Sequence, residues 1–143
     1  MAHQAEHRGE WGDVEWKGSA QQEPDDFYAT ATEIRDVTDV ENWTNLSVNE
    51  AVCQYGRASN QRSCSLDIQD VSQECSIDGV TTDRLVMMNG TNNGIDGDSG
   101  GGWSFATVAY GSDVGWCFPT FTDNDVWSVA DLYQEAIGVT VRQ

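Results

Sequence analysis

The sequence predicts an all-β protein with a modest core. Along most of its 143 residues, short apolar stretches alternate with acidic, asparagine-rich or glycine-rich turns, which is the pattern of short strands. Apolar residues make up 38 % of the chain, below the usual figure of about 45 to 50 %. Six tryptophans, four tyrosines and four cysteines nevertheless favour a folded domain, because large aromatics bury much apolar area and cross-links restrict the unfolded chain.

Three short strands are expected in the N-terminal third of the chain. They are rich in aromatic or β-branched residues and are bounded by acidic turns: Trp11–Trp16, Phe27–Thr32 and Ile34–Val40. The polar, asparagine-rich stretch from Glu41 to Asn49 suits a connection between two substructures. We therefore place a domain boundary near Asn45, which separates residues 1–45 from residues 46–143.

A β-hairpin, a shaped loop and a further strand are expected in the middle of the chain. The hairpin runs from Ala51 to Val71 around a turn at Gly56–Ser63, with Leu66 and Ile68 alternating against polar neighbours. Glycine and asparagine dominate residues 89–102, so this segment is expected to be a loop that uses positive φ values. A strand is then predicted over residues 103–110.

One helix is predicted, near the C-terminus. Between Val129 and Ile137 apolar residues recur at i, i+3, i+4, i+7 and i+8, which gives a helix one apolar face for docking on a sheet. Ser128 is placed to cap its start and Gly138 to end it. Val139–Val141 is expected to add a last short strand.

The charge of the chain limits its partners. Seven basic residues stand against 24 acidic ones, for a net charge of −17, so phosphate backbones and anionic lipid surfaces are repelled. No apolar run reaches the length of about 18 residues that a membrane span needs. We therefore expect neither a nucleic-acid nor a membrane partner.

The cysteines favour an extracellular, secreted protein. Four cysteines in a small acidic chain are typical of an oxidising compartment. Glycosylation-type triplets begin at Asn42, Asn45 and Asn89 and agree with that setting. A secretory leader is not recognisable in residues 1–10, so we expect it to have been removed or to lie outside this sequence.

The string Gly97-Asp98-Ser99-Gly100-Gly101 carries the most specific chemical signal. A nucleophilic serine needs a tight turn that presents its hydroxyl, and backbone N–H groups aimed at the oxyanion that forms when a carbonyl is attacked. The glycines permit such a turn, and the amides of Gly97 and Ser99 are the expected donors. Asp98 is expected to anchor the loop through an ion pair or hydrogen bonds. The competing interpretation is an ordinary polar turn.

Around this string the sequence resembles the chymotrypsin-like serine endopeptidases, and among them the secreted bacterial branch typified by streptogrisin and α-lytic protease. Relatives carry a hairpin of the form V-C-x-x-G-R-x-x-G-x-x-C, and this chain reads Val52-Cys53-Gln54-Tyr55-Gly56-Arg57 up to Cys64. Their pocket wall, C-terminal helix and final G-V-x-V resemble Gly115-Trp116-Cys117, Leu132–Ile137 and Gly138-Val139-Thr140-Val141. The resemblance covers about Ala51 to Val141. It implies a double β-barrel, with residues 1–45 the C-terminal part of a truncated first barrel and residues 46–143 a complete second barrel with its helix.

The resemblance also implies a catalytic serine, histidine and aspartate. Ser99 matches the nucleophile, and Asp13, within Gly12-Asp13-Val14-Glu15-Trp16, is the candidate aspartate, although a solvated acidic turn remains the alternative. Relatives carry the histidine in a T-A-x-H segment well before the aspartate, whereas this chain has only His3 and His7, which we interpret as non-catalytic residues on a frayed N-terminus. We therefore expect about a third of a complete protease to be missing upstream.

The cysteine pairing follows from the same resemblance. Four cysteines allow three connectivities. A bridge from Cys53 to Cys64 closes the hairpin as in the relatives, and we predict a second bridge from Cys75 to Cys117, which would tether the segment before the serine loop to the pocket wall. Zinc binding is disfavoured because no C-x-x-C spacing and no nearby histidine accompanies these cysteines. We expect no metal and no cofactor.

Two departures from the relatives concern the serine loop. Gly102 replaces a proline that is frequent in the relatives, and Gln54 replaces an arginine that in the relatives pairs with the aspartate before the nucleophile, so the partner of Asp98 is left open. Substrate choice is expected to depend on pocket walls at about Asn93–Asp96 and Tyr110–Trp116. Asp96 and Asp113 are compatible with basic substrate side chains, but the acidity of the whole chain leaves the specificity open.

The leading hypothesis is a secreted serine endopeptidase that hydrolyses polypeptides through an acyl-enzyme on Ser99, seen as a fragment without its histidine segment. Its expected partners are a polypeptide substrate and an upstream segment or an inhibitor. The alternative is a non-catalytic homologue that acts as an acidic, disulfide-stapled binding domain.

Overall fold

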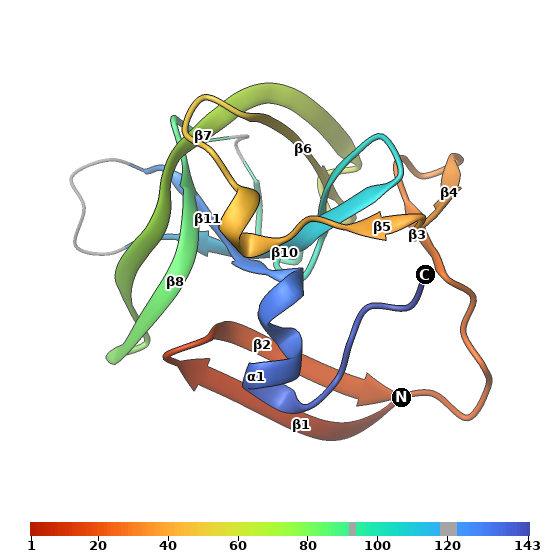
Figure 1. Ribbon diagram of the computed structural model, residues 1–143. Helices are drawn as coiled ribbons and strands as arrows, with labels where there is room; N and C mark the ends of the chain where they lie inside the picture. The colour runs from red at the N-terminus through yellow and green to blue at the C-terminus, as the bar shows by residue number, and fades with distance from the viewer. Residues whose placement is uncertain (92–93, 118–122) are drawn as a thin grey trace.

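The all-β prediction is confirmed. The computed structural model describes residues 1–91, 94–117 and 123–143, and these form mostly strands with one short C-terminal α-helix. Figure 1 shows a barrel-like sheet above, a two-stranded ribbon below it, and the helix between the two.

Six antiparallel strands close into a barrel. They pair in the ring order β11-β8-β7-β6-β9-β10, and β10 pairs back onto β11. Their bounds are β6 Ala51–Gly56, β7 Gln61–Ile77, β8 Val80–Met88, β9 Gly102–Phe105, β10 Val108–Trp116 and β11 Asp125–Val129. Closure pairs the main-chain N–H and C=O groups that the edges of an open sheet would expose. It also brings the loop between β8 and β9 next to β10.

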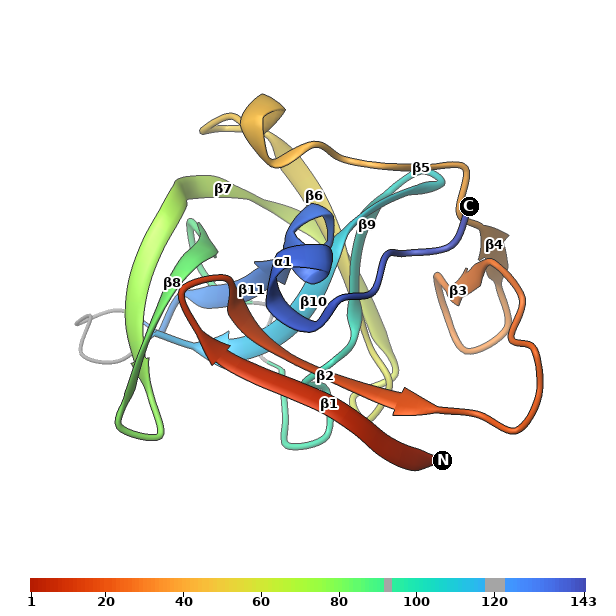
Figure 2. The same cartoon turned by 60° about the horizontal axis from the view of Figure 1, so that its bottom comes forward.

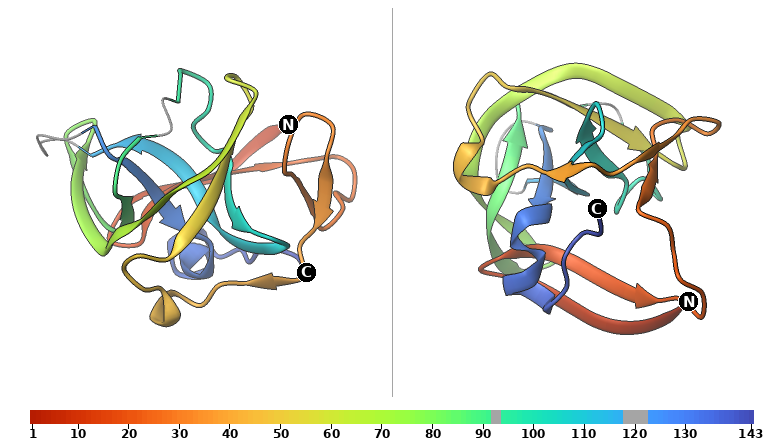
Figure 3. Two further views of the ribbon diagram at one scale, coloured as in Figure 1. Left: turned by 90° about the horizontal axis from the view of Figure 1, so that it is seen from above. Right: turned by 45° about the vertical axis from the view of Figure 1, so that its right-hand side comes forward.

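Residues before the barrel form two small sheets and one added strand. β1 (Ala2–Gly9) and β2 (Gly12–Gly18) make the ribbon, while β3 (Asp26–Tyr28) pairs with β4 (Ile34–Asp36). β5 (Asp39–Val40) joins β10 in parallel, and the 3-10 turn η1 (Trp43–Asn45) leads to β6. Figures 2 and 3 show that the β1–β2 ribbon and the β3–β4 pair lie on different sides of the barrel.

Aromatic residues fill the barrel interior. Trp103 of β9 and Trp127 of β11 are fully buried and stack with ring centroids 5.9 Å apart, and Tyr110 of β10 meets Trp127 edge-on. Inward-facing positions of several strands thus converge on two large rings, which supply much buried area in a chain with few aliphatic residues.

The predicted strand over residues 103–110 is wrong in extent. The chain turns at Ala106, which adopts φ 53°, so the segment is a hairpin of β9 and β10 instead of one strand. The alternation of aromatic and small residues fits both sides of such a hairpin, and no glycine or asparagine marks the turn. The expected strands near residues 27–32 and 34–40 are likewise shorter, because each ends in a turn after two or three residues.

The C-terminal helix begins later than predicted. Val129 belongs to β11, residues 130–132 form the 3-10 turn η2, and α1 covers Tyr133–Ile137. Ser128 does not cap it, because its hydroxyl bonds the main chain of Asp13. Gly138 ends the helix as predicted, with φ 74° and its amide on the Gln134 carbonyl. Val139–Val141 forms no strand.

The N-terminus is a strand, which corrects the expectation of a frayed end. β1 pairs along nearly its whole length with β2, and His7 faces Val14 across the ribbon. Polar residues dominate β1, so its sequence lacks the apolar alternation that marks a half-buried strand. β8 was also not anticipated, although its second half is a fully buried run.

Both expected disulfides are present. Cys53 is joined to Cys64 across the β6–β7 hairpin, and Cys75 of β7 is joined to Cys117, directly after β10. The second bridge connects strands on opposite sides of the serine loop in sequence, 42 residues apart.

The two bridges should differ in their contribution to stability. Closing a longer loop removes more entropy from the unfolded chain, which corresponds to about 4 kcal/mol for the Cys75–Cys117 bridge and about 3 kcal/mol for the Cys53–Cys64 bridge. Urea unfolding of the two double-alanine variants measures the difference. A larger loss on removal of Cys53–Cys64 would contradict this order.

Candidate active site

The Ser99 loop is held against β10 by main-chain hydrogen bonds. The Gly100 amide donates to the Asp113 carbonyl, the Asp113 amide donates back to the Gly101 carbonyl, and the Gly101 amide donates to the Asp98 carbonyl. A Cβ on Gly101 would approach the Tyr55 carbonyl to 2.6 Å, so only glycine fits there. Gly97 and Gly100 adopt φ values of 98° and 83°, which glycine tolerates without strain.

Asp98 fixes the loop from behind. Its side chain is 2 % exposed, and its carboxylate accepts the amides of Ala58 and Ser59 at 2.8 and 3.0 Å and the amide of Ile95 at 3.1 Å. Gly56 leaves the room for this carboxylate, because a Cβ there would lie 2.4 Å from its Cγ. The partner that the sequence left open is therefore a set of main-chain amides, with no ion pair.

The amide contacts determine the ionisation of Asp98. Burial opposes the charged form, but the hydrogen bonds from the Ser59, Ile95 and Ala58 amides outweigh it and hold the pKa of this carboxyl below its usual value. Asp98 therefore stays charged at neutral pH, and its charge is stabilised by amides of its own loop and of the Ala58–Ser59 turn.

Ser99 is exposed at the tip of this fixed loop. Across the described ranges, no acceptor bonds the amides of Gly97 or Ser99, whereas the amides of Asp98, Gly100 and Gly101 all donate within the protein. The Ser99 hydroxyl has no hydrogen-bond partner there either. The loop thus offers the Ser99 hydroxyl and two unbonded main-chain donors, the amides of Gly97 and Ser99.

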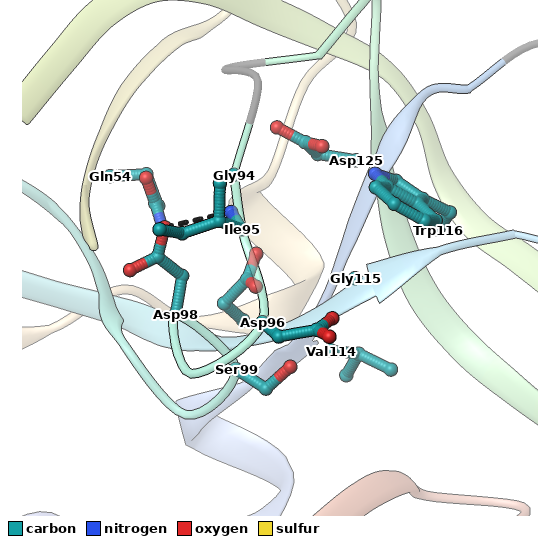
Figure 4. A pocket seen from close by; sticks show the side chains of 11 residues that line it. Gln54, Gly94, Ile95, Asp96, Asp98, Ser99, Val114, Gly115, Trp116 and Asp125 are labelled. Carbon is teal, nitrogen blue, oxygen red and sulfur yellow. Dashed lines mark hydrogen bonds between the residues drawn. The ribbon is translucent and has the colours of Figure 1, made fainter. Parts of the chain in front are cut away.

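Ser99 lies at the junction of two cavities. The smaller cavity, of about 220 Å³, extends from Ser99 past Asp96 and Val114 to Trp116 and Asp125. Figure 4 shows Ser99 at one side of it with its hydroxyl directed toward the side where Val114 lies, and Trp116 and Asp125 at the other. The larger cavity, of about 660 Å³, lies between the barrel and the ribbon, and its lining includes both Ser99 and Asp13.

Asp13 is positioned by the barrel although it belongs to the ribbon. The Ser128 hydroxyl accepts the Asp13 amide and donates to the Asp13 carbonyl, both at 2.8 Å. Gly12, with φ 110°, permits this approach because a Cβ would meet the Ser128 hydroxyl at 2.9 Å. Arg8 binds the Asp13 carboxylate at 3.0 Å. Burial raises the pKa of Asp13, and Arg8 partly offsets that rise.

Neither histidine reaches the Ser99 loop. His3 pairs with Glu15 on the ribbon at 3.0 Å, and the His7 ring packs near Gly9 with its buried Nε2 unbonded. Neither residue belongs to the lining of the two cavities that Ser99 shares. The structure thus brings together Ser99, Gly97, Asp98 and, across the larger cavity, Asp13, with no imidazole beside the serine in the described part of the chain.

The smaller cavity is acidic. Asp96, Asp113 and Asp125 line it together with Asp98. The Asp113 carboxylate accepts the Trp103 indole N–H at 3.1 Å. Burial raises the pKa of Asp113 to about 7 against the effect of that hydrogen bond, and the nearby charges of Asp125 and Asp98 raise it further. Asn93, also expected at the wall, lies outside the described residues.

Sequence reasoning missed several residues of the site. Gln54 and Asp125 line the smaller cavity, Ser128 holds Asp13, and the amides of Ala58 and Ser59 hold Asp98. The only available signal was the Gly56-Arg57-Ala58-Ser59 turn beside Cys53, whose glycine and small residues suit a close main-chain approach. Within the described ranges, no group of three metal-ligating side chains occurs, and no helix is long and apolar enough to cross a bilayer.

Comparisons with known proteins support the fold. No family model matches the chain, and no curated protein matches it in sequence. A solved structure of a glutamic-acid-specific serine protease, described as using a histidine triad in substrate binding, is similar with a TM-score of 0.68 at 15 % identity. The match covers 90 % of this chain and 65 % of that one, so the chain spans about two thirds of its length. The fold is therefore the chymotrypsin-like β fold.

Replacing Asp98 should loosen the loop in a pH-dependent way. In Asp98→Asn the side-chain NH2 group takes the place of the oxygen that accepts the Ile95 N–H. Two donors then face each other, which should lower the free energy of unfolding by about 1 to 3 kcal/mol at pH 7. Because the folded pKa is lowered, the Asp98 contribution is complete above the unfolded pKa of about 3.9 and is lost as the pH falls below it. Urea unfolding at pH 7 and pH 3 checks this, and equal stability of the two proteins at pH 7 would contradict it.

Asp113 should behave in the opposite way. Its folded pKa of about 7 lies above the unfolded value of about 3.9. Ionisation of Asp113 therefore lowers the free energy of unfolding as the pH rises from about 4 to about 7, and this loss stays constant at higher pH. Asp113→Asn keeps an oxygen for the Trp103 N–H. The variant should therefore be more stable than the parent at pH 8 and equally stable near pH 4, as measured by unfolding midpoints. A variant less stable at pH 8 would overturn the assignment.

Proposed function

We propose that this chain is the nucleophile-bearing part of a secreted serine endopeptidase of the chymotrypsin-like family, in the branch that includes streptogrisin and α-lytic protease. The observation that carries the proposal is the Ser99 loop, which presents an exposed hydroxyl beside the unbonded amides of Gly97 and Ser99 and is held in place by Asp98. An ordinary polar turn has no need of a buried carboxylate with three amide donors.

The proposed chemistry is acyl transfer in two steps. Ser99 Oγ attacks the carbonyl carbon of a peptide bond while its proton passes to a base, and the oxyanion accepts hydrogen bonds from the amides of Gly97 and Ser99. Collapse of the tetrahedral intermediate returns the proton to the leaving amine and leaves an acyl group on Ser99. Water then releases that acyl group by the same sequence.

The base in this proposal is a histidine from outside the 143 residues. The larger cavity supports this assignment, because it lies between Ser99 and Asp13 and has the room for an additional segment. Asp13 would orient the imidazole from its place on Ser128. Arg8 now binds the Asp13 carboxylate, so an incoming imidazole has to displace that ion pair.

The domain assignment belongs to the same proposal. Residues 46–143 hold the closed barrel and α1 and correspond to a second barrel. Residues 1–45 correspond to the end of a first barrel, which agrees with β1–β2 and β3–β4 pairing as two separate two-stranded sheets outside the closed barrel. The two disulfides agree with an extracellular protein.

The glutamate preference of the structural neighbour is not carried over. Its substrate binding involves histidines, whereas in the described part of this chain the cavity beside Ser99 is lined by carboxylates and by no histidine. Carboxylates would repel an acidic substrate side chain.

A binding role is the second candidate. Ser99 has no base beside it in the described part of the chain, and Arg8 neutralises Asp13. A non-catalytic homologue would keep the barrel and the disulfides while using its acidic surface to bind a partner.

A serine-directed fluorophosphonate tests the enzyme proposal. The chain should be prepared as it stands and with the sequence encoded immediately upstream, each beside a Ser99→Ala control. The proposal predicts labelling of Ser99 in the extended protein, no labelling in Ser99→Ala, and at least about a hundredfold slower labelling of the 143 residues alone, since general-base assistance contributes about 10² or more. An extended protein that stays unlabelled, or an upstream sequence that encodes no histidine segment, would favour the binding role.

A further inference from the structure

The smaller cavity has the size of a site for one side chain. Its volume of about 220 Å³ is below the range of about 300 to 1,000 Å³ that is usual for drug-sized ligands. Ser99 stands at its edge, so a residue whose side chain enters the cavity has its own main-chain carbonyl near the Ser99 hydroxyl (Figure 4).

Carboxylates reach this cavity from three separate parts of the chain. Asp96 comes from the serine loop, Asp113 from β10 and Asp125 from β11. Asp98, the fourth, directs its charge to the Ala58, Ser59 and Ile95 amides. Carboxylates from one loop and two strands therefore meet at one cavity, next to Ser99.

The protein itself supplies no positive charge to this cavity. Among the residues that the structure describes, its lining holds no lysine, arginine or histidine. The seven remaining residues of the chain, at 92–93 and 118–122, are asparagine, phenylalanine, proline and threonine in type. Burial is the main cause of the high pKa of Asp113, and the acidic neighbours Asp125 and Asp98 raise it further.

We propose that this cavity binds a cationic side chain, lysine or arginine, of the polypeptide substrate. The specificity rests on the proposed function, since it names the residue whose carbonyl Ser99 would attack. Asp113 and Asp96 supply the opposite charge. Trp116, 60 % exposed and part of the same lining, adds an aromatic surface on which a guanidinium or ammonium group is favoured.

Physical reasons favour a cation over an apolar side chain here. A neutral side chain would bury the carboxylates further without compensating them, which costs free energy. A cation pairs with them in a site of reduced dielectric, where the interaction is stronger than in water. The bound cation also removes the repulsion between Asp113 and Asp125.

Benzamidine binding tests the specificity without requiring catalysis. The 15.7 kDa chain suits an NMR titration of backbone amides, carried out at pH 8, above the pKa of Asp113. Benzamidine carries an amidinium, benzamide is its neutral analogue, and benzoate carries the opposite charge. We expect benzamidine to shift amides of residues 94–99 and 113–116, and benzamide and benzoate to leave them unchanged.

Charge-neutral variants assign the effect to the cavity. Asp113→Asn should weaken benzamidine binding by about tenfold or more, the scale of one lost hydrogen bond to a charged group. Asp96→Asn, at an exposed position that the fold does not need, should weaken it by a smaller factor. Asp36→Asn removes the same charge from β4, lines neither cavity and should change binding by less than about twofold.

The outcomes separate this inference from the proposed function. Benzamide binding as tightly as benzamidine, equal effects of Asp36→Asn and Asp113→Asn, or calcium ions producing the same shifts and displacing benzamidine would each overturn the side-chain assignment. Ser99 labelling by the fluorophosphonate together with failed benzamidine binding would contradict the cationic specificity but support the endopeptidase proposal. Benzamidine binding without Ser99 labelling would contradict the endopeptidase proposal but support the cation-binding cavity.

Discussion

The buried carboxylate of Asp98 is the contact on which the functional part of this structure depends. Its three amide partners come from the turn after β6 and from its own loop, so one side chain fixes the distance between two distant segments. Gly56 leaves space for the carboxylate, and Gly101 allows the loop to lie close to the Tyr55 carbonyl of β6. Ser99, with its exposed hydroxyl and unbonded amide, is the residue that this arrangement presents.

Two carboxyls that line the same cavity show how surroundings decide ionisation. Asp98 is buried and Asp113 is half-buried, yet the pKa of Asp98 is lowered and that of Asp113 is raised. Asp98 has enough amide donors to offset the loss of hydration, whereas Asp113 has one indole N–H and two acidic neighbours. The first carboxyl stabilises the loop. The second lines an acidic cavity, in which a bound cation would reduce the repulsion between carboxylates.

Sequence predicted the elements whose signals are local. The glycine-rich loop, the β6–β7 hairpin, the end of the helix at Gly138 and the all-β class each follow from residue types close together in the chain. The break between β9 and β10 was not predictable, because it depends on Ala106 accepting a positive φ that its side chain does not favour. Ser128 was assigned to the helix because a serine before an apolar repeat is a typical cap, while tertiary contact with Asp13 determined its actual role.

The sequence identified individual residues of the site but not the contacts between them. Asp98 was identified as an anchor, but two of its three donors lie about 40 residues earlier and are main-chain amides, which carry no side-chain signature. The approach of Asp13 to the barrel likewise rests on a contact across 115 residues. Pairings of this range depend on closure of the whole barrel, which short sequence patterns do not encode.

Residue-resolved hydrogen exchange of the backbone amides tests the central arrangement most directly. The amides of Gly97 and Ser99 should exchange at nearly the rate of an unstructured peptide, while those of Ala58, Ile95 and Gly100 should be strongly protected because they donate within the fold. Protection of Gly97 and Ser99, or rapid exchange at Ala58 and Ile95, would show that the loop is not held in the form described.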